Sequence, residues 1–154
     1  MRKGRYAVIL LVILLDQVVK LLIRGAFEPN ESVDLIGSLL SLTYVKNTGA
    51  AFSMFSGARV ILVILPLIVM GVGVWYMEKH PKAHWTLFLA LSLAIGGGIS
   101  NLFDRLAFGF VTDMFDLHFW PVFNVADIAI CIGCGLLVLY ILRFYDRDKA
   151  ADNQ

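Results

Sequence analysis

Charged residues are scarce in this 154-residue sequence, and their scarcity restricts its class. Only 16% of the residues are charged, whereas 59% are hydrophobic. Soluble globular domains average about 25% charged and about 45–50% apolar residues. This composition excludes an ordinary soluble enzyme and indicates an integral membrane protein. The formal net charge is only +1, so no overall basic field would attract nucleic acid, and we expect no nucleic-acid partner.

Cysteine and histidine are also rare, and their positions exclude several kinds of site. Cys131 and Cys134 lie inside an apolar run, without a histidine or a second cysteine pair nearby. This position suits neither a disulfide framework nor a zinc site, so we interpret both as packing residues. His118 stands alone, without a serine for nucleophilic catalysis, and fits an interfacial belt. We expect no metal and no cofactor.

Long apolar runs predict four membrane-spanning helices. A helix needs roughly 17–25 residues to cross a hydrocarbon core of about 30 Å. The second and third runs contain no charged residue, whereas Asp16 and Lys20 interrupt the first and Asp127 lies at the start of the fourth. The basic N-terminus would also fit a secretory signal peptide, but no small-residue cleavage site follows, so we predict a retained first span. The predicted spans cover residues 6–23, 60–77, 85–103 and 126–143.

Lysine and arginine predict the orientation of these spans. Eight of them flank the spans on the side that holds both termini, and four lie on the other side. Because cytoplasmic loops are enriched in basic residues, we expect both termini in the cytoplasm and the longer loops, about 24–59 and 104–126, outside.

The fold predicted from these patterns is an integral membrane, mainly α protein, with one domain over residues 1–154. It is a four-transmembrane-helix bundle with a small extracytoplasmic β-containing loop region. Apolar and polar residues alternate over 40–44, which predicts a short strand or hairpin. Small residues recur at every fourth position of the third span, and this spacing lets helices approach closely in lipid.

Polar residues that lipid should exclude map to a single face of the membrane. An ionisable side chain within a span is costly unless it is paired or hydrated, so each one is a functional candidate. The set comprises Asp16, Gln17, Lys20, Asn47, Thr48, Asn101, Asp104, Arg105, Asp113, Asp116, Asn124 and Asp127.

Single members of this set also have purely structural explanations. Asp16 and Lys20, four residues apart on a helix, would neutralise one another. Asp127 would interact favourably with a helix N-terminus. As a set, the carboxylates favour an aspartyl hydrolase, in which two nearby aspartates share a proton and act as general base and general acid. Residue type alone leaves Asp104, Asp113 and Asp116 open as the partner of Asp127.

Five short motifs carry a resemblance to a known family. They are DQVVK at 16–20, NTGAAF at 47–52, GGISNLFDR at 97–105, VTD at 111–113 and FNVAD at 123–127. In this order they resemble the lipoprotein signal peptidase (signal peptidase II) family, over nearly the whole chain. The family pattern more often has Gly at Ser100 and Phe at Met114, and we expect neither difference to impair activity.

The resemblance implies an intramembrane aspartyl endopeptidase of the bacterial cytoplasmic membrane, with its active site near the outer face. It would cleave the signal peptide from a prolipoprotein just before a diacylglyceryl-modified cysteine. The expected partners are this lipid-modified substrate and membrane lipid, and we expect a monomer. The catalytic pair would be Asp113 and Asp127. The residues that orient the pair and hold the substrate would be Asp16, Asn47, Asn101, Asp104, Arg105 and Asn124.

One further hypothesis concerns the loop around residues 47–52, which would clamp the substrate through Phe52. Two other functions are possible for such a chain, an ion-coupled carrier and a non-catalytic assembly subunit. A carrier should have charged residues along a path across the bilayer and an internal repeat, and neither is found. An assembly subunit would tolerate asparagine in place of its aspartates.

Overall fold

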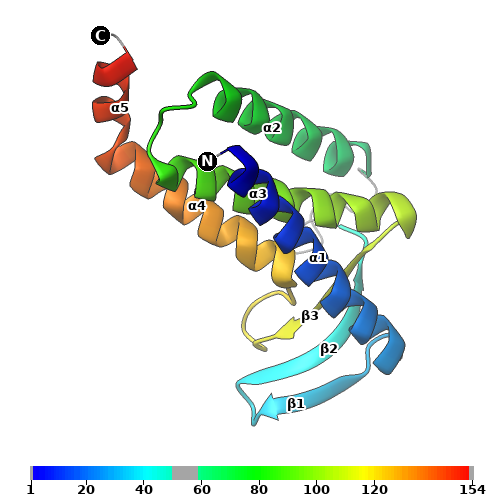
Figure 1. Ribbon diagram of the computed structural model, residues 1–154. Helices are drawn as coiled ribbons and strands as arrows, with labels where there is room; N and C mark the ends of the chain where they lie inside the picture. Colours follow the sequence, from blue (N-terminus) through cyan, green and yellow to red (C-terminus); the bar gives the residue numbers. More distant parts are fainter. Residues whose placement is uncertain (1, 50–58, 153–154) are drawn as a thin grey trace.

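Four long helices form the body of the protein in the computed structural model, which describes residues 2–49 and 59–152 (Figure 1). Each is long and apolar enough to cross a membrane, which agrees with the four predicted spans. The first helix extends beyond the predicted run at both ends, because polar residues continue it past the apolar stretch. The helices are α1 (Arg2–Ala26), α2 (Arg59–Lys79), α3 (Trp85–Ala107) and α4 (Val125–Arg143).

Helix α3 is the centre of the bundle and contacts each of the other three. Three consecutive glycines allow this arrangement, because Gly96 faces α1, Gly97 faces α4 and Gly98 faces α2. A Cβ atom on Gly97 would collide with the backbone carbonyl oxygen of Ala126. The predicted close packing at the small residues of this helix is therefore confirmed, and it brings the start of α4 directly against α3.

A three-stranded antiparallel sheet lies at one end of the bundle (Figure 1). Its strands are β1 (Ser32–Ile36), β2 (Leu40–Asn47) and β3 (Val111–Asp116), in that order across the sheet. The predicted hairpin is confirmed by β1 and β2. Strand β3 lies in what we predicted as a loop: its first four residues are all buried, so it lacks the alternation that marks a half-exposed strand.

The opposite end of the bundle holds the start of α1 and a short helix, α5 (Tyr145–Asp152), that was not predicted (Figure 1). The guanidinium of Arg5 lies 3.4 Å from the centre of the Phe88 ring. The same group donates to the carbonyl oxygens of Met77 and Pro81, each at 3.2 Å. These contacts connect α1 to the end of α2 and to the short connection into α3.

Replacing Gly97 with alanine tests the packing of α3 against α4. The added Cβ would meet the Ala126 carbonyl, and overpacking of this kind costs about 1–3 kcal/mol. We therefore expect Gly97→Ala to lower the thermal unfolding temperature of the purified protein in detergent. Gly135→Ala in α4 is the matched control, because a Cβ there meets nothing within 4 Å. Equal unfolding temperatures for the two variants would contradict the close approach.

Candidate active site

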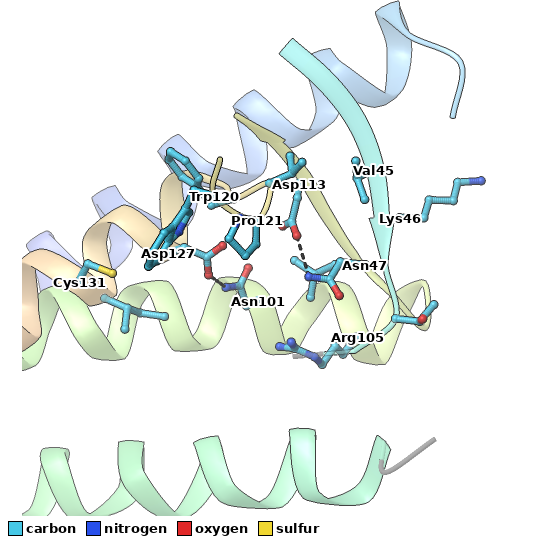
Figure 2. A pocket seen from close by; sticks show the side chains of 15 residues that line it. Val45, Lys46, Asn47, Asn101, Arg105, Asp113, Trp120, Pro121, Asp127 and Cys131 are labelled. Atoms are coloured by element: carbon cyan, nitrogen blue, oxygen red, sulfur yellow. Dashed lines mark hydrogen bonds between the residues drawn. The ribbon is translucent and has the colours of Figure 1, made fainter. Parts of the chain in front are cut away.

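Asp113 and Asp127 face one cavity of about 450 Å³ at the sheet end of the bundle (Figure 2). Asp113 comes from β3, and Asp127 from the first turn of α4. The two carboxyl groups do not hydrogen bond to each other in the described structure; both are directed at the same space. The other lining residues used below are Asn47, Asn101, Arg105, Trp120, Ile130 and Cys131.

Strand pairing positions Asp113. In the β2–β3 register Val45 lies opposite Asp113, so Asn47, two residues further along β2, is its diagonal neighbour on the same face. The Asn47 amide Nδ2 donates to Asp113 Oδ2 at 2.8 Å, and Asn124 Nδ2 donates to Oδ1 at 2.6 Å. Both oxygens of this carboxyl group, which is only 2% exposed, are therefore hydrogen bonded.

A capping box positions Asp127. Asn124 is the N-cap of α4: its side-chain oxygen accepts from the Asp127 backbone N–H at 2.9 Å. In return, the Asp127 side chain accepts from the Asn124 backbone N–H at 3.2 Å. Asn101 Nδ2 donates to the other Asp127 oxygen at 2.8 Å. Asp127 thus interacts with the N-terminus of α4, as the sequence suggested, and it also faces the cavity.

Beneath the two aspartates lies a buried ion cluster formed by Lys20, Asp16 and Asp104. The ammonium Nζ lies 2.8 Å from Asp16 Oδ2 and 3.1 Å from Asp104 Oδ2, and all three side chains are 0% exposed. The suggested pairing of Asp16 with Lys20 is therefore correct but incomplete. Lys20 also donates to Asn101 Oδ1 at 2.8 Å, which connects the cluster to the cavity.

Asp16 also joins three helices. Its Oδ1 accepts from the backbone N–H of Ala126 at 2.8 Å, in the first turn of α4. Its Oδ2 accepts from the Ser100 hydroxyl on α3 at 2.6 Å. Ser100 therefore has a second role besides its small size, which lets helices approach closely: its hydroxyl donates a hydrogen bond to a buried carboxylate. We predicted that serine at this position, where the family pattern more often has glycine, does not impair activity, and this remains a prediction.

Sequence reasoning missed the residues that connect Asp104 to the sheet. The backbone N–H of Thr112, in β3, donates to Asp104 Oδ2 at 3.0 Å. Arg24 donates to the Thr112 hydroxyl at 3.0 Å and lies 3.6 Å from Asp104 Oδ1. Only the basic charge of Arg24 at the end of the first span could have indicated this contact.

Arg105 lines the cavity and donates to the carbonyl oxygen of Gly49 at 3.3 Å. The backbone N–H of Gly49 in turn donates to Asn47 Oδ1 at 3.0 Å. Residues 47–49 are thereby held at the edge of the cavity. Phe52, to which we assigned a clamping role, lies outside the described residues.

The remaining candidates lie elsewhere. Asp104 is covered by its partners, and neither it nor Asp116 lines the cavity, so geometry leaves Asp113 as the residue that faces the same space as Asp127. The expectation that His118 has no serine partner is wrong, because its Nε2 lies 3.1 Å from the Ser41 hydroxyl. Ser41 is, however, fully buried and donates its proton to Asp34 at 2.7 Å, so it is no exposed nucleophile.

Burial has a strong effect on the Asp113 carboxyl. Loss of solvent raises its pKa from 3.8 to about 7, and the nearby charge of Asp127 acts in the same direction. The hydrogen bonds from Asn47 and Asn124 and the positive charge of Lys20 oppose the rise. A neutral Asp113 is therefore well populated near neutral pH. Over residues 2–49 and 59–152, no group of three or more His, Cys, Asp or Glu side chains is arranged to bind a metal.

Comparisons with known proteins agree with this arrangement. A family model described as Signal peptidase (SPase) II matches residues 8–143. The lipoprotein signal peptidase of Halothermothrix orenii is 40% identical over 147 residues, which cover 96% of this chain and 99% of that protein. The lipoprotein signal peptidase of Moorella thermoacetica is 43% identical over 133 residues, with coverages of 86% and 89%.

Two solved structures of a bacterial membrane enzyme are also similar, each with 28% sequence identity. Their TM-scores are 0.87 and 0.84; they cover 92% of this chain, and the chain covers 88% and 94% of theirs. The shared fold is thus a four-helix membrane bundle with a small sheet. Because the family match spans most of the sequence and relatives are about 40% identical over nearly their full length, this chain belongs to the signal peptidase II family.

Proposed function

We propose that Asp113 and Asp127 are the catalytic pair with which this protein cleaves signal peptides from diacylglyceryl-modified prolipoproteins, just before the lipidated cysteine. As a member of the signal peptidase II family, the chain is a membrane protease. The observation that carries the catalytic assignment is geometric. Two carboxyl groups from different elements face one cavity, and each is held by N–H donors.

The surroundings of the two aspartates favour different roles. Asp127 lies at the N-terminus of α4, where the helix dipole and a backbone N–H stabilise a negative charge, so it acts as the general base. Asp113 is almost fully buried on a strand, where the neutral acid is favoured, so it acts as the general acid.

Hydrolysis then proceeds in two proton-balanced steps. Asp127 removes a proton from water, whose oxygen attacks the scissile carbonyl carbon, while Asp113 donates its proton to the carbonyl oxygen. In the second step the C–N bond breaks. Asp127 returns its proton to the leaving amine nitrogen, and the hydroxyl proton of the intermediate passes back to Asp113. The pair ends with the single proton with which it began.

The lining of the cavity supports a substrate that is part peptide and part apolar. Polar groups of Asn47 and Arg105 lie on one side, where they would bind an extended peptide backbone (Figure 2). The side chains of Trp120, Ile130 and Cys131 provide apolar surface for an acyl chain or a hydrophobic signal segment. The relatives named above are lipoprotein signal peptidases, which supports the same substrate class.

The protein acts in the bacterial cytoplasmic membrane, and we propose that both termini are cytoplasmic and the cavity lies near the outer face. The support is the distribution of basic residues: Lys79, Lys82 and Arg143 lie at the same end of the bundle as the start of α1, away from the sheet. We also propose that the chain functions as one domain and as a monomer, because the two aspartates already have an N–H donor to each of their four oxygens within it.

Asparagine substitutions test the catalytic assignment. Asp113→Asn and Asp127→Asn keep the side-chain shape but remove the acid, so we expect each to lower kcat by roughly 10²–10⁴-fold. The assay is cleavage of a diacylglyceryl-modified prolipoprotein peptide in detergent. Asp116→Asn, on the same strand but outside the cavity, is the control and should retain most activity. Near wild-type cleavage by either of the first two variants would reject the assignment.

The rate should depend on the ionisation of Asp113. Because the general acid must be protonated, kcat/KM should fall as the pH rises through about 7. The Asn47 hydrogen bond lowers the pKa of Asp113, so Asn47→Ala should raise that pKa and move the alkaline limb to higher pH. The measurement is kcat/KM against pH for both proteins. A limb that stays in place or moves to lower pH would show that Asp113 is not the titrating acid.

Selective labelling of the cysteines tests whether the substrate occupies the cavity. Both cysteines are exposed, so their interpretation as packing residues is wrong. Cys131 lines the cavity, one helical turn after Asp127, whereas Cys134 does not. A maleimide on Cys131 should therefore block substrate and lower turnover by at least about tenfold, which corresponds to about 1.4 kcal/mol. The comparison uses Cys134→Ser, which keeps only Cys131, and Cys131→Ser as its control. Equal sensitivity of the two proteins would contradict this placement.

A further inference from the structure

The ammonium of Lys20 determines which atoms of its neighbours face it. An ammonium has three N–H donors and no acceptor. Three oxygens surround Lys20 Nζ: Asp16 Oδ2 at 2.8 Å, Asp104 Oδ2 at 3.1 Å and Asn101 Oδ1 at 2.8 Å. Because the side chain is 0% exposed, no solvent competes for these protons. The Asn101 amide must therefore present its oxygen to Lys20. If its NH₂ group lay there instead, two hydrogen-bond donors would face each other without an acceptor.

The orientation of Asn101 has a direct consequence for Asp127. With its oxygen on Lys20, the amide presents its nitrogen to Asp127 Oδ1, at 2.8 Å (Figure 2). The same Asn101 oxygen accepts from Asn124 Nδ2 at 3.1 Å. A second hydrogen bond fixes the same orientation of the Asn124 amide, because the Asp127 backbone N–H donates to the Asn124 side-chain oxygen. The Asn124 amide nitrogen therefore faces both Asn101 and Asp113.

Every carboxyl oxygen of the proposed catalytic pair accepts an N–H, and two of these four donors belong to the amides that Lys20 orients. Asn124 and Asn47 donate to the two oxygens of Asp113, while Asn101 and the Asn124 backbone donate to the two oxygens of Asp127. The lone pairs on the protein side are occupied by these donors. The one proton that the pair needs is thereby directed into the cavity, where the substrate carbonyl and the water must lie.

We propose that Lys20 is a positioning residue of the reaction, which fixes the Asn101 amide with its nitrogen toward Asp127. This inference rests on the proposed function of Asp113 and Asp127. A flipped Asn101 would place its oxygen against Asp127 Oδ1 and remove a donor from the carboxylate. Asp127 would then favour its protonated form and lose its capacity to accept a proton from water. A role limited to charge balance would require only that the buried charges sum to zero.

The first experiment separates N–H donation by Lys20 from its charge. Lys20→Met and Lys20→Gln are made in an Asp16→Asn background, which removes one buried anion and leaves Asp104 with Arg24, 3.6 Å away. Both double variants are equally neutral at position 20, but only glutamine has an N–H that can donate to Asn101 Oδ1. The reference protein is Asp16→Asn alone, and the measurements are kcat, KM and the pH dependence of kcat.

We expect Lys20→Met to lower kcat by about 10–100-fold against the reference, with KM changed by less than about threefold. Its acidic limb should move to higher pH, because the base has lost a donor to its charged form. Lys20→Gln should recover at least part of kcat and of the pH profile. Methionine and glutamine variants with equal kcat and equal profiles would overturn the proposal, whether both match the reference or both fall below it.

Asn101→Asp provides an independent test that does not depend on the folding of the Lys20 variants. One oxygen of the new carboxylate would still face Lys20, but the other would replace the donor to Asp127 by an acceptor. The variant should therefore lose activity near neutral pH and regain part of it in acid, where the new carboxyl becomes a donor. A wild-type pH profile would overturn the proposal.

These outcomes also separate the two proposals. If the Asp113→Asn and Asp127→Asn proteins are active, the proposed function is wrong. If those variants are inactive while the Lys20 and Asn101 variants keep the reference profiles, only the positioning role fails.

Discussion

The structure of the site depends on one constraint: three charged side chains are buried within a bundle that is built to lie in a membrane. Lys20, Asp16 and Asp104 have no exposed surface, and a charge in such a place is costly unless it is paired and hydrogen bonded. Each of the three meets this requirement with partners from a different element. Asp16 holds the first turn of α4, Asp104 holds the backbone of β3, and Lys20 holds Asn101 on α3. The cluster thereby sets where the strand and helix that carry Asp113 and Asp127 come together.

Packing and polarity reinforce each other around this cluster. Gly97 lets the start of α4 lie against α3, which brings Asn124 within 3.1 Å of Asn101. The Asn101 oxygen accepts from the buried ammonium and from Asn124, so the nitrogens of these two amides are left to donate to Asp127 and Asp113. An amide can give and accept hydrogen bonds without carrying charge, so it connects a buried cation to two acids without adding a further ion to desolvate. The cavity therefore receives two carboxyl groups, each of which is held by two N–H donors.

Much of this arrangement could be predicted from the sequence, and the rest depends on contacts between distant segments. Apolar length indicated the four helices, and the rarity of charge within them made each buried ion conspicuous. The choice of Asp113 over Asp116 depends on the β2–β3 register, which no local pattern reports, and β3 itself lacks alternation because both of its faces are covered. The hydrogen bond from Ser100 to Asp16 joins residues 84 positions apart, so no local spacing in the sequence could predict it. Short α5 has too few apolar residues to stand out from a polar tail.

The central claim is that one proton resides on Asp113 near neutral pH, and side-chain carboxyl NMR tests it most directly. Wild-type protein labelled with ¹³C at the aspartate carboxyl carbon would be titrated in detergent from about pH 4 to about pH 9, a range that spans ordinary and strongly raised carboxyl pKa values. We expect one carboxyl resonance to titrate near pH 7 and to be missing from Asp113→Asn. If every aspartate carboxyl were already ionised by about pH 5, the neutral general acid would not exist and the account would be wrong.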